Sequence, residues 1–219
     1  MDSFARALSA LQRELVGLLG VVPSAYFTGG TVLSGYLGHR TSLDVDVFVT
    51  EVGDVDLAGT LLQSSAASRG WTIQVLRRLP GFRRFRVGAG DESTLVDIAH
   101  EAVPQVVPLE AKPVREGVRV DSLEDLIANK LCAVLGRNEV KDLVDLYFLS
   151  ESGVDVVSHL RAAHAKDGGM EPATLAFVLK QMPTDPAGLR LLRPVDAQQL
   201  AAYRDELVAT LLSKAWPEP

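Results

Sequence analysis

Two aspartates separated by a single residue are the side chains of this sequence best suited to chemistry. Asp44 and Asp46 lie in segment 43–50, where apolar residues alternate with Asp44, Asp46 and Phe48. This period of two predicts a strand with both aspartates on one face, their Cα atoms ~6.5–7 Å apart. Two carboxylates held in this way repel each other and favour a hard cation such as Mg²⁺ between them. A solvated strand face is the alternative, and it is the commoner explanation of an isolated pair.

A pair of glycines strengthens the cation hypothesis. The sequence predicts a strand over 25–28, a turn at Gly29 and Gly30, and a helix from Thr31 to Leu37. Glycines let a backbone approach a polyphosphate closely, and a helix N-terminus offers free N–H donors to an anion. With the two aspartates on the following strand, the pattern predicts a site for a metal-bound triphosphate.

The elements that must position these residues form an α/β pattern in the first half of the chain. We expect an amphipathic helix from Phe4 to Leu19 with Ser3 as its N-cap, and a second helix over 56–68. Further strands are expected over 71–76 and 82–87, joined through Pro80 and Gly81, and over 94–99. The first part of the chain is therefore predicted to be a mixed-sheet domain.

The second half of the chain has a helical pattern throughout. After a proline-rich connector, Asp121 and Glu124 are expected to form a capping pair for a helix that Gly136 to Asn138 interrupts. The fold class is thus α/β, with a mixed-sheet domain over 1–115 and a helical lobe over 116–219. Further helices are expected over 140–150, 154–165, 172–181 and 196–214.

Composition excludes several classes of protein. The 219 residues are 47% hydrophobic and 23% charged, which is typical of a globular protein and not of a disordered or fibrous one. The longest apolar run, 15–22, is far below the ~20 residues that cross a bilayer. One cysteine, Cys132, excludes a disulfide framework. We expect a cytoplasmic protein with no signal peptide and no membrane association.

The motifs of the chain resemble those of a known family. One comprises residues 28–31 (Thr-Gly-Gly-Thr) and 38–48 (Gly-His-Arg-Thr-Ser-Leu-Asp-Val-Asp-Val-Phe). The other comprises residues 129–131 (Asn-Lys-Leu), Arg137 and 141–147 (Lys-Asp-Leu-Val-Asp-Leu-Tyr). In this order and at this distance they are similar to the motifs of the AbiEii-like abortive-infection nucleotidyltransferase toxins, within the DNA polymerase β-type superfamily.

The resemblance implies a role for each matching residue. Asp44 and Asp46 would ligate Mg²⁺, with Mn²⁺ as an alternative ion, and Asp97 would be a third metal-binding carboxylate from a later strand. Lys130 would contact the nucleotide phosphates, and Asp145 together with Asp142 would complete the catalytic set. The candidates for holding the triphosphate in the first motif are Gly29, Gly30, Thr31 and Ser42.

The residues of the second motif also have a simpler explanation. Lys130 lies on the apolar stripe of its predicted helix, where a lysine is costly unless it meets an anion. Asp142 and Asp145 are three residues apart and share a helix face. A structural salt bridge from these aspartates to Lys141 or Arg137 carries about the same weight as a catalytic role.

A basic hairpin lies between the two motifs. Residues 77–86 contain five arginines and no acid, although the net charge of the chain is −6. Arg84 and Arg86 share a predicted strand face with Phe82, so they could bind the phosphates of a nucleotide or of an RNA acceptor. The alternative is that these arginines protect an edge strand from pairing with other chains.

The resemblance leads to one functional hypothesis and two rivals. It implies an enzyme that moves a nucleoside monophosphate from an NTP to a hydroxyl, with the tRNA 3′ end as acceptor, acting as the toxin of a toxin–antitoxin or phage-defence pair with a cognate antitoxin. One rival is transfer to a small molecule or to a protein. The other is an NTP- or RNA-binding protein without catalysis.

Overall fold

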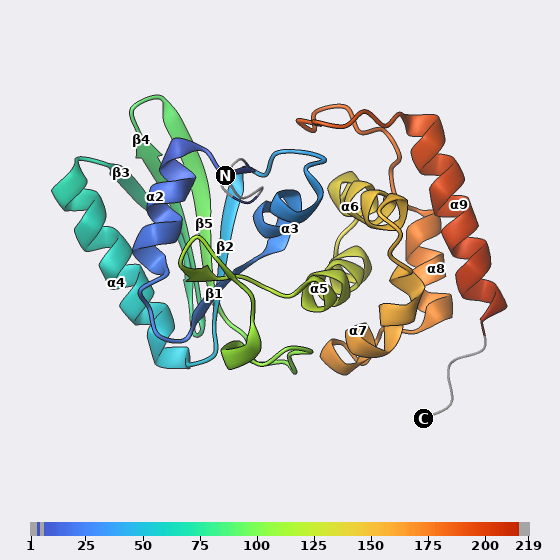
Figure 1. Ribbon diagram of the computed structural model, residues 1–219, viewed down its shortest axis with the longest axis horizontal. Helices are drawn as coiled ribbons and strands as arrows, with labels where there is room; N and C mark the ends of the chain where they lie inside the picture. The colour runs from blue at the N-terminus through green and yellow to red at the C-terminus, as the bar shows by residue number, and fades with distance from the viewer. Residues whose placement is uncertain (1–3, 5–6, 215–219) are drawn as a thin grey trace. The chain divides into compact units, whose positions relative to one another are not determined.

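The computed structural model describes residue 4 and residues 7–214, and it divides the chain into two units (Figure 1). The first unit runs to Ala102 and includes Val107–Ser122; the second includes Val103–Val106 and continues from Leu123. The division therefore falls after Ser122, whereas the sequence predicts it after residue 115. The reason is that the amide of Asp121 donates to the carbonyl of Phe27 at 2.7 Å, which joins this segment to the sheet of the first unit.

A mixed five-stranded sheet forms the centre of the first unit. Its strand order is β1-β2-β5-β4-β3, with β2 and β5 parallel and the other neighbours antiparallel. This confirms the predicted α/β fold class. The strands are β1 (Ala25–Thr28), β2 (Asp44–Val49), β3 (Thr72–Leu79), β4 (Phe82–Ala89) and β5 (Glu92–His100).

Two helices, α2 (Ala10–Leu19) and α4 (Val52–Arg69), cover one face of this sheet (Figure 1). The strand residues that point toward them are apolar and almost fully buried, and each contributes roughly 1.5–3 kcal/mol by leaving water. The alternate residues of β2, among them Asp44 and Asp46, are only half-buried. The residues at the centre of the buried face are Val45, Val47, Phe85, Val96 and Ile98.

Helix α2 begins later than the sequence pattern predicts. Ser9 is its N-cap, and the Ser9 side chain and the Gln12 side chain form a reciprocal capping box. The predicted helix from Phe4 is therefore wrong over Leu8 and Ser9, because the capping interaction ends any continuous helix there. The predicted N-cap, Ser3, lies outside the described residues.

Helix α3 (Gly29–Leu37) follows β1 directly and begins two residues earlier than expected. Gly38 ends it in the left-handed conformation that glycine accepts most easily. The first unit is completed by the short helix η1 (Leu109–Ala111) and by the two-stranded hairpin of β6 (Val114–Arg115) and β7 (Val118–Arg119).

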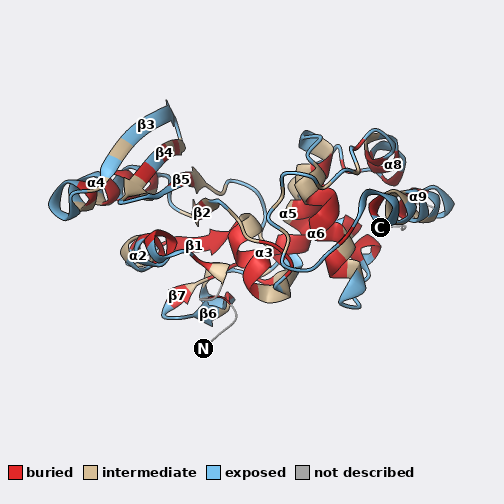
Figure 2. Ribbon diagram, turned by 90° about the horizontal axis from the view of Figure 1, so that it is seen from above, coloured by how far each residue is buried: buried red, intermediate tan, exposed pale blue. Residues whose placement is uncertain are grey.

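The second unit is helical, as the sequence predicts. Helix α5 packs against α6, α7 and α8, and Figure 2 shows buried residues concentrated on α5 and α6. Segment 154–165 is not one helix, because the Asp155 side chain accepts from the amides of Val157 and Ser158 and starts a separate 3₁₀ turn. The elements are α5 (Leu123–Gly136), α6 (Val140–Glu151), η2 (Val156–His159), α7 (Leu160–Lys166), α8 (Pro172–Lys180) and α9 (Ala197–Ser213). No helix within the described part of the chain is long and apolar enough to span a membrane.

Candidate active site

The three aspartates of the first unit share one face of the sheet. In the parallel pairing of β2 with β5, Asp46 lies directly opposite Asp97, and Asp44 lies two residues before Asp46. Val96 and Ile98 point to the opposite, fully buried face, as the alternation predicts for Asp97. The face that carries these carboxylates is half-exposed, so it is accessible to a ligand.

Arg84 extends this row onto the next strand. It pairs with Asp97 across β4 and β5, and its Nε and Nη2 donate to the two carboxylate oxygens of Asp97 at 2.7 and 2.5 Å. The hydrogen bond from Arg84 to Asp97 is the main reason why the pKa of Arg84 is raised; burial opposes this rise, and the charges of Asp97, Asp44 and Asp46 reinforce it. All three carboxylates therefore act electrostatically on one guanidinium.

Arg86 and Phe82 lie on the same face as Arg84. Arg86 is exposed and lies next to Gln74, with 3.5 Å between its Nη1 and the Gln74 Oε1. The guanidinium of Arg84 lies 5.8 Å from the centre of the Phe82 ring, within the range of a cation–π contact. The sequence suggested phosphate binding for Arg84 and did not predict that Arg84 holds Asp97, because no local pattern reveals which strands become neighbours.

The start of α3 touches the aspartates directly. Gly29 has φ +72°, and a Cβ atom at this position would overlap the carboxylate of Asp46. A Cβ atom at Gly30 would meet Nη2 of Arg40 at 2.8 Å and Oγ of Ser42 at 3.0 Å. These two glycines therefore let the helix N-terminus approach Asp46, Arg40 and Ser42 closely.

Thr31 connects the same helix to the aspartate strand. Its hydroxyl donates to the backbone carbonyl of Asp44, and the residue is buried. Thr28, at the N-cap position of α3, makes no capping hydrogen bond with its side chain. Instead its hydroxyl donates to Asp121 at 2.6 Å. The first amides of α3 are thus not capped by the Thr28 side chain, and the Thr31 side chain fixes β2 against the helix.

A second polar network in the first unit was not expected. Asp121 accepts from Thr28 and from the buried ammonium of Lys112 at 2.7 Å, and Lys112 lies over the ring of Tyr26. The sequence assigns Asp121 to the cap of α5, but the helix begins at Leu123, so Ser122 occupies the N-cap position. No sequence signal connects Lys112 with Thr28, because these residues come from separate segments.

The donor set of the aspartate face suits Mg²⁺ only in part. Within the described part of the chain, no group of three His, Cys, Asp or Glu side chains is arranged to hold a metal ion by itself. Mg²⁺ is usually bound by one or two carboxylates and completed by substrate phosphates. Asp44 and Asp46 fit that pattern, whereas both oxygens of Asp97 accept hydrogen bonds from Arg84.

The charged residues of the second motif form a compact cluster in the helical unit. The ammonium of Lys130 lies 2.9 Å from Asp142 and 2.6 Å from Asp145, and all three side chains are buried. Arg137 adds two hydrogen bonds to Asp142, at 2.8 and 2.9 Å. Lys141 pairs with Glu139 instead. The aspartates thus form structural salt bridges, as the simpler explanation predicts, and their partners are Lys130 and Arg137 and not Lys141.

This cluster keeps Asp142 ionised. Burial alone would raise the pKa of Asp142, but the hydrogen bonds and charges of Arg137 and Lys130 outweigh it, so the pKa is lowered from its ordinary value. The cluster joins α5 to α6, since Lys130 belongs to one helix and both aspartates to the other.

The chain matches the sequence pattern of a family of nucleotidyltransferases. The sequence profile described as "Nucleotidyl transferase AbiEii toxin, Type IV TA system" matches residues 15–218. This match spans most of the chain, so the chain belongs to the AbiEii nucleotidyltransferase toxin family. It is accordingly an enzyme of nucleotidyl transfer and the toxin component of a toxin–antitoxin pair, as the sequence motifs imply.

Solved structures support the same fold. A proposed nucleotidyltransferase from H. pylori superimposes with a TM-score of 0.59 at 22% identity, over 93% of this chain and 96% of the other. MenT4, a nucleotidyltransferase toxin from Mycobacterium tuberculosis H37Rv, superimposes with a TM-score of 0.62 at 18% identity, over 97% of this chain and 85% of the other. No curated protein sequence matches the chain.

Proposed function

We propose that this enzyme depends on Mg²⁺ and transfers the nucleoside monophosphate of an NTP to the 3′-terminal hydroxyl of a tRNA. The observation that carries the proposal is the row of carboxylates in which Asp46 lies opposite Asp97, with Asp44 on the same face and the N-terminus of α3 against Asp46. Helix N-termini bind phosphates through their free amides and their positive dipole end. Carboxylates and helix amides side by side suit a metal-bound triphosphate.

The proposed reaction displaces pyrophosphate. The acceptor oxygen bonds to the α-phosphorus, the bond from the α-phosphorus to the oxygen that bridges to the β-phosphorus breaks, and pyrophosphate leaves. A Mg²⁺ ion on Asp44 and Asp46, or Mn²⁺ in its place, would neutralise charge on the triphosphate and the leaving group. The hydroxyl proton passes to a carboxylate, for which Asp97 is our candidate, since Arg84 fixes its orientation.

The remaining assignments are part of this proposal. Gly29, Gly30 and Thr31 offer backbone amides to the phosphates, and Ser42 adds a hydroxyl beside Gly30. Arg86 is exposed on the aspartate face and is suited to an acceptor phosphate. Lys130 is proposed to contact nucleotide phosphates by family resemblance alone, since its ammonium already lies between two carboxylates.

The proposal is tested by incubating the protein with Mg²⁺, each of the four labelled NTPs and total tRNA, followed by a denaturing gel. We expect label at the tRNA 3′ end with one or more NTPs, and its loss when Mg²⁺ is chelated. The substitution Asp46→Asn keeps the size of the side chain beside Gly29, but it removes one of the two negative charges of Asp44 and Asp46. It should reduce transfer about 10²–10³-fold, the typical effect of losing one group that stabilises developing charge.

Asp91→Asn is the matched control, because Asp91 is an exposed aspartate in the β4–β5 turn. It should leave transfer unchanged. Full transfer by Asp46→Asn would contradict the assignment of the site. Release of pyrophosphate with a protein or small-molecule acceptor, but not with tRNA, would keep the transfer reaction and overturn the tRNA acceptor.

A further inference from the structure

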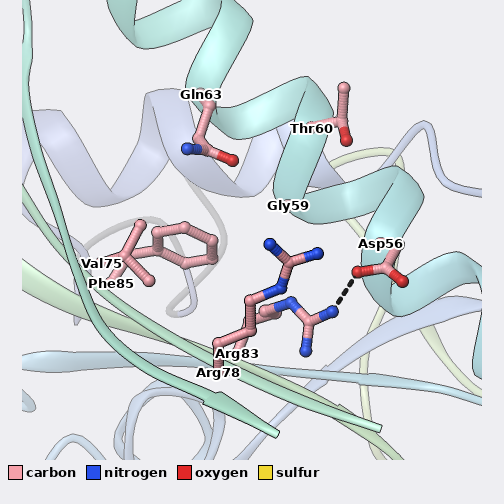
Figure 3. Close-up of a pocket in the computed structure, with 8 residues that line it drawn as sticks. All are labelled: Asp56, Gly59, Thr60, Gln63, Val75, Arg78, Arg83 and Phe85. Atoms are coloured by element: carbon pink, nitrogen blue, oxygen red, sulfur yellow. Dashed lines mark hydrogen bonds and ion pairs between the residues drawn. The ribbon is translucent and has the colours of Figure 1, made fainter. Parts of the chain in front are cut away.

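Some arginines of the β3–β4 hairpin lie on the side of the sheet that faces away from the aspartates. A cavity of about 240 Å³ opens between β3, β4 and α4. Figure 3 shows the guanidinium groups of Arg78 and Arg83 next to each other in this cavity, opposite α4. The helix contributes Asp56, Gly59, Thr60 and Gln63, which fall on one face of α4. Val75 and Phe85 form the apolar part of the wall.

The register of the hairpin explains why the two arginines meet. Arg78 lies directly opposite Arg83 in the antiparallel pairing of β3 and β4, so their side chains leave the same face. Like charges directly opposite each other destabilise a sheet. Arg77 and Arg84 are the preceding opposite pair, so they lie on the aspartate face instead. The five arginines of 77–86 are therefore divided between two faces.

Arg83 is anchored but keeps donors available. It is 9% exposed; its Nη1 donates to the carbonyls of Leu79 and Phe82, and its Nη2 donates to Asp56. A guanidinium has five N–H groups, so its Nε–H and one Nη2–H have no partner among the described residues.

Arg78 has no hydrogen bond or ion pair to any described residue and is exposed. Because Asp56 is the single carboxylate beside Arg78 and Arg83, these three side chains together keep one excess positive charge. Two guanidiniums that present unused donors to one cavity suit an oxyanion with several acceptor oxygens.

The helix side of the cavity leaves room for such an anion. Gly59 lies in the interior of α4, where glycine costs about 1 kcal/mol relative to alanine. A Cβ atom there would lie 3.4 Å from Cζ of Phe85 and 3.9 Å from Cγ of Arg83, which are ordinary contacts. An alanine in place of Gly59 would therefore fit, but its methyl group would occupy space at the wall of the cavity. The hydroxyl of Thr60 and the amide of Gln63 line the same wall.

We propose that this cavity binds a phosphate group, held by Arg78 and Arg83, at a site distinct from the aspartate face. The phosphate is that of a free anion or a phosphodiester of an RNA strand. The proposal requires no nucleotidyl transfer and is tested by binding alone, so it stands or fails separately from the proposed reaction.

The test follows the amide resonances of Gly59 and Thr60 by NMR, without divalent metal, while inorganic phosphate or a single-stranded oligoribonucleotide lacking terminal phosphates is added. Saturable shifts at these amides are expected with one or both ligands. Saturation with the oligoribonucleotide identifies a phosphodiester as a ligand, and saturation with inorganic phosphate alone identifies a small anion. Absence of saturable shifts with both ligands would overturn the proposal.

Three variants and one control sharpen the result. Arg78→Gln should weaken binding about tenfold or more, because it removes a charge-assisted donor. Gly59→Ala should weaken it by narrowing the cavity, whereas Asp56→Asn should strengthen it severalfold by removing the competing carboxylate. Arg77→Gln removes the same charge from the neighbouring position on the other face and should leave the shifts unchanged. Equal losses of binding affinity in Arg77→Gln and Arg78→Gln would overturn the proposal, because general surface charge and not this cavity would then account for binding.

Discussion

The identity of Gly29 bears directly on the geometry of the aspartate face. It combines a left-handed backbone, φ +72°, with direct approach to the Asp46 carboxylate. A side chain at this position costs about 1–2 kcal/mol for the backbone alone. It would also displace Asp46.

Gly29→Ala should therefore reduce both the stability of the protein and its affinity for the proposed Mg²⁺–NTP complex. The expected destabilisation is at least about 1–2 kcal/mol by urea unfolding, and the affinity for the Mg²⁺–NTP complex should fall at least tenfold by calorimetry. Gly38→Ala is the control, since Gly38 has φ +60° but open space around it. It should show the backbone cost without the loss of affinity. Equal affinities for the two variants would argue against a role of the Gly29–Asp46 contact in binding.

The helices of the second unit are joined by charge as well as by apolar packing. Asp142 is fully buried, and it connects α6 to Lys130 on α5 and to Arg137 just beyond α5. Its pKa is lowered in the folded protein, chiefly because Arg137 and Lys130 outweigh the effect of burial. In the unfolded chain the pKa returns to about 3.9. Folding therefore favours the ionised form of Asp142. The ionised side chain stabilises the folded protein above the unfolded pKa, and this stabilisation is lost as pH falls through the lower pKa of the folded state.

Asp142→Asn should destabilise the protein by about 3–5 kcal/mol at pH 7, the cost of breaking a buried ion pair. The difference from the wild type should begin to shrink below about pH 4, where Asp142 of the unfolded chain takes up a proton, and should be smallest below the lowered folded pKa, where the folded carboxyl is protonated as well. Urea unfolding at a series of pH values measures this, with Asp91→Asn as an exposed control. A difference that stays constant with pH would show that the charge of Asp142 does not carry the effect.

Strands and helices are the level at which the sequence is most informative. The alternation of 43–50 predicts β2 and its two faces, and Gly38 and Gly70 mark the ends of α3 and α4. The start of α2 is less predictable, because apolar spacing continues through Leu8 and Ser9 while a local capping box ends the pattern. Periodicity thus identifies elements better than it fixes their boundaries.

Pairings between distant segments are what the sequence does not reveal. The aspartate pair and the glycine turn can be found from spacing alone, because both are local. The hydrogen bonds from Arg84 to Asp97, and from Lys112 to Asp121, depend on strand order and on the path of a connecting segment. The same holds for Arg78 and Arg83, since the hairpin register, with its irregularity after Val75, decides which arginines of the two strands lie opposite each other.

The charge of the whole molecule sets a constraint on an RNA acceptor. The chain carries a net charge of −6, so contact with RNA must be confined to local basic surfaces such as the β3–β4 hairpin. Each phosphate contact to a single strand changes the slope of log affinity against log salt by about 0.7. The salt dependence of the proposed tRNA modification would therefore report how many cations of this chain touch the acceptor.

Arg86→Gln should reduce the salt slope of tRNA binding by about 0.7 and weaken tRNA modification at physiological salt, because Arg86 is exposed on the aspartate face. Transfer to a small-molecule acceptor should not change, since such an acceptor has no backbone phosphates to contact. Filter binding between 50 and 200 mM salt measures the slope, and Arg190→Gln, an exposed arginine of the helical unit, is the control of equal charge. If Arg86→Gln and Arg190→Gln change the slope equally, long-range charge and not a contact at the hairpin accounts for RNA binding.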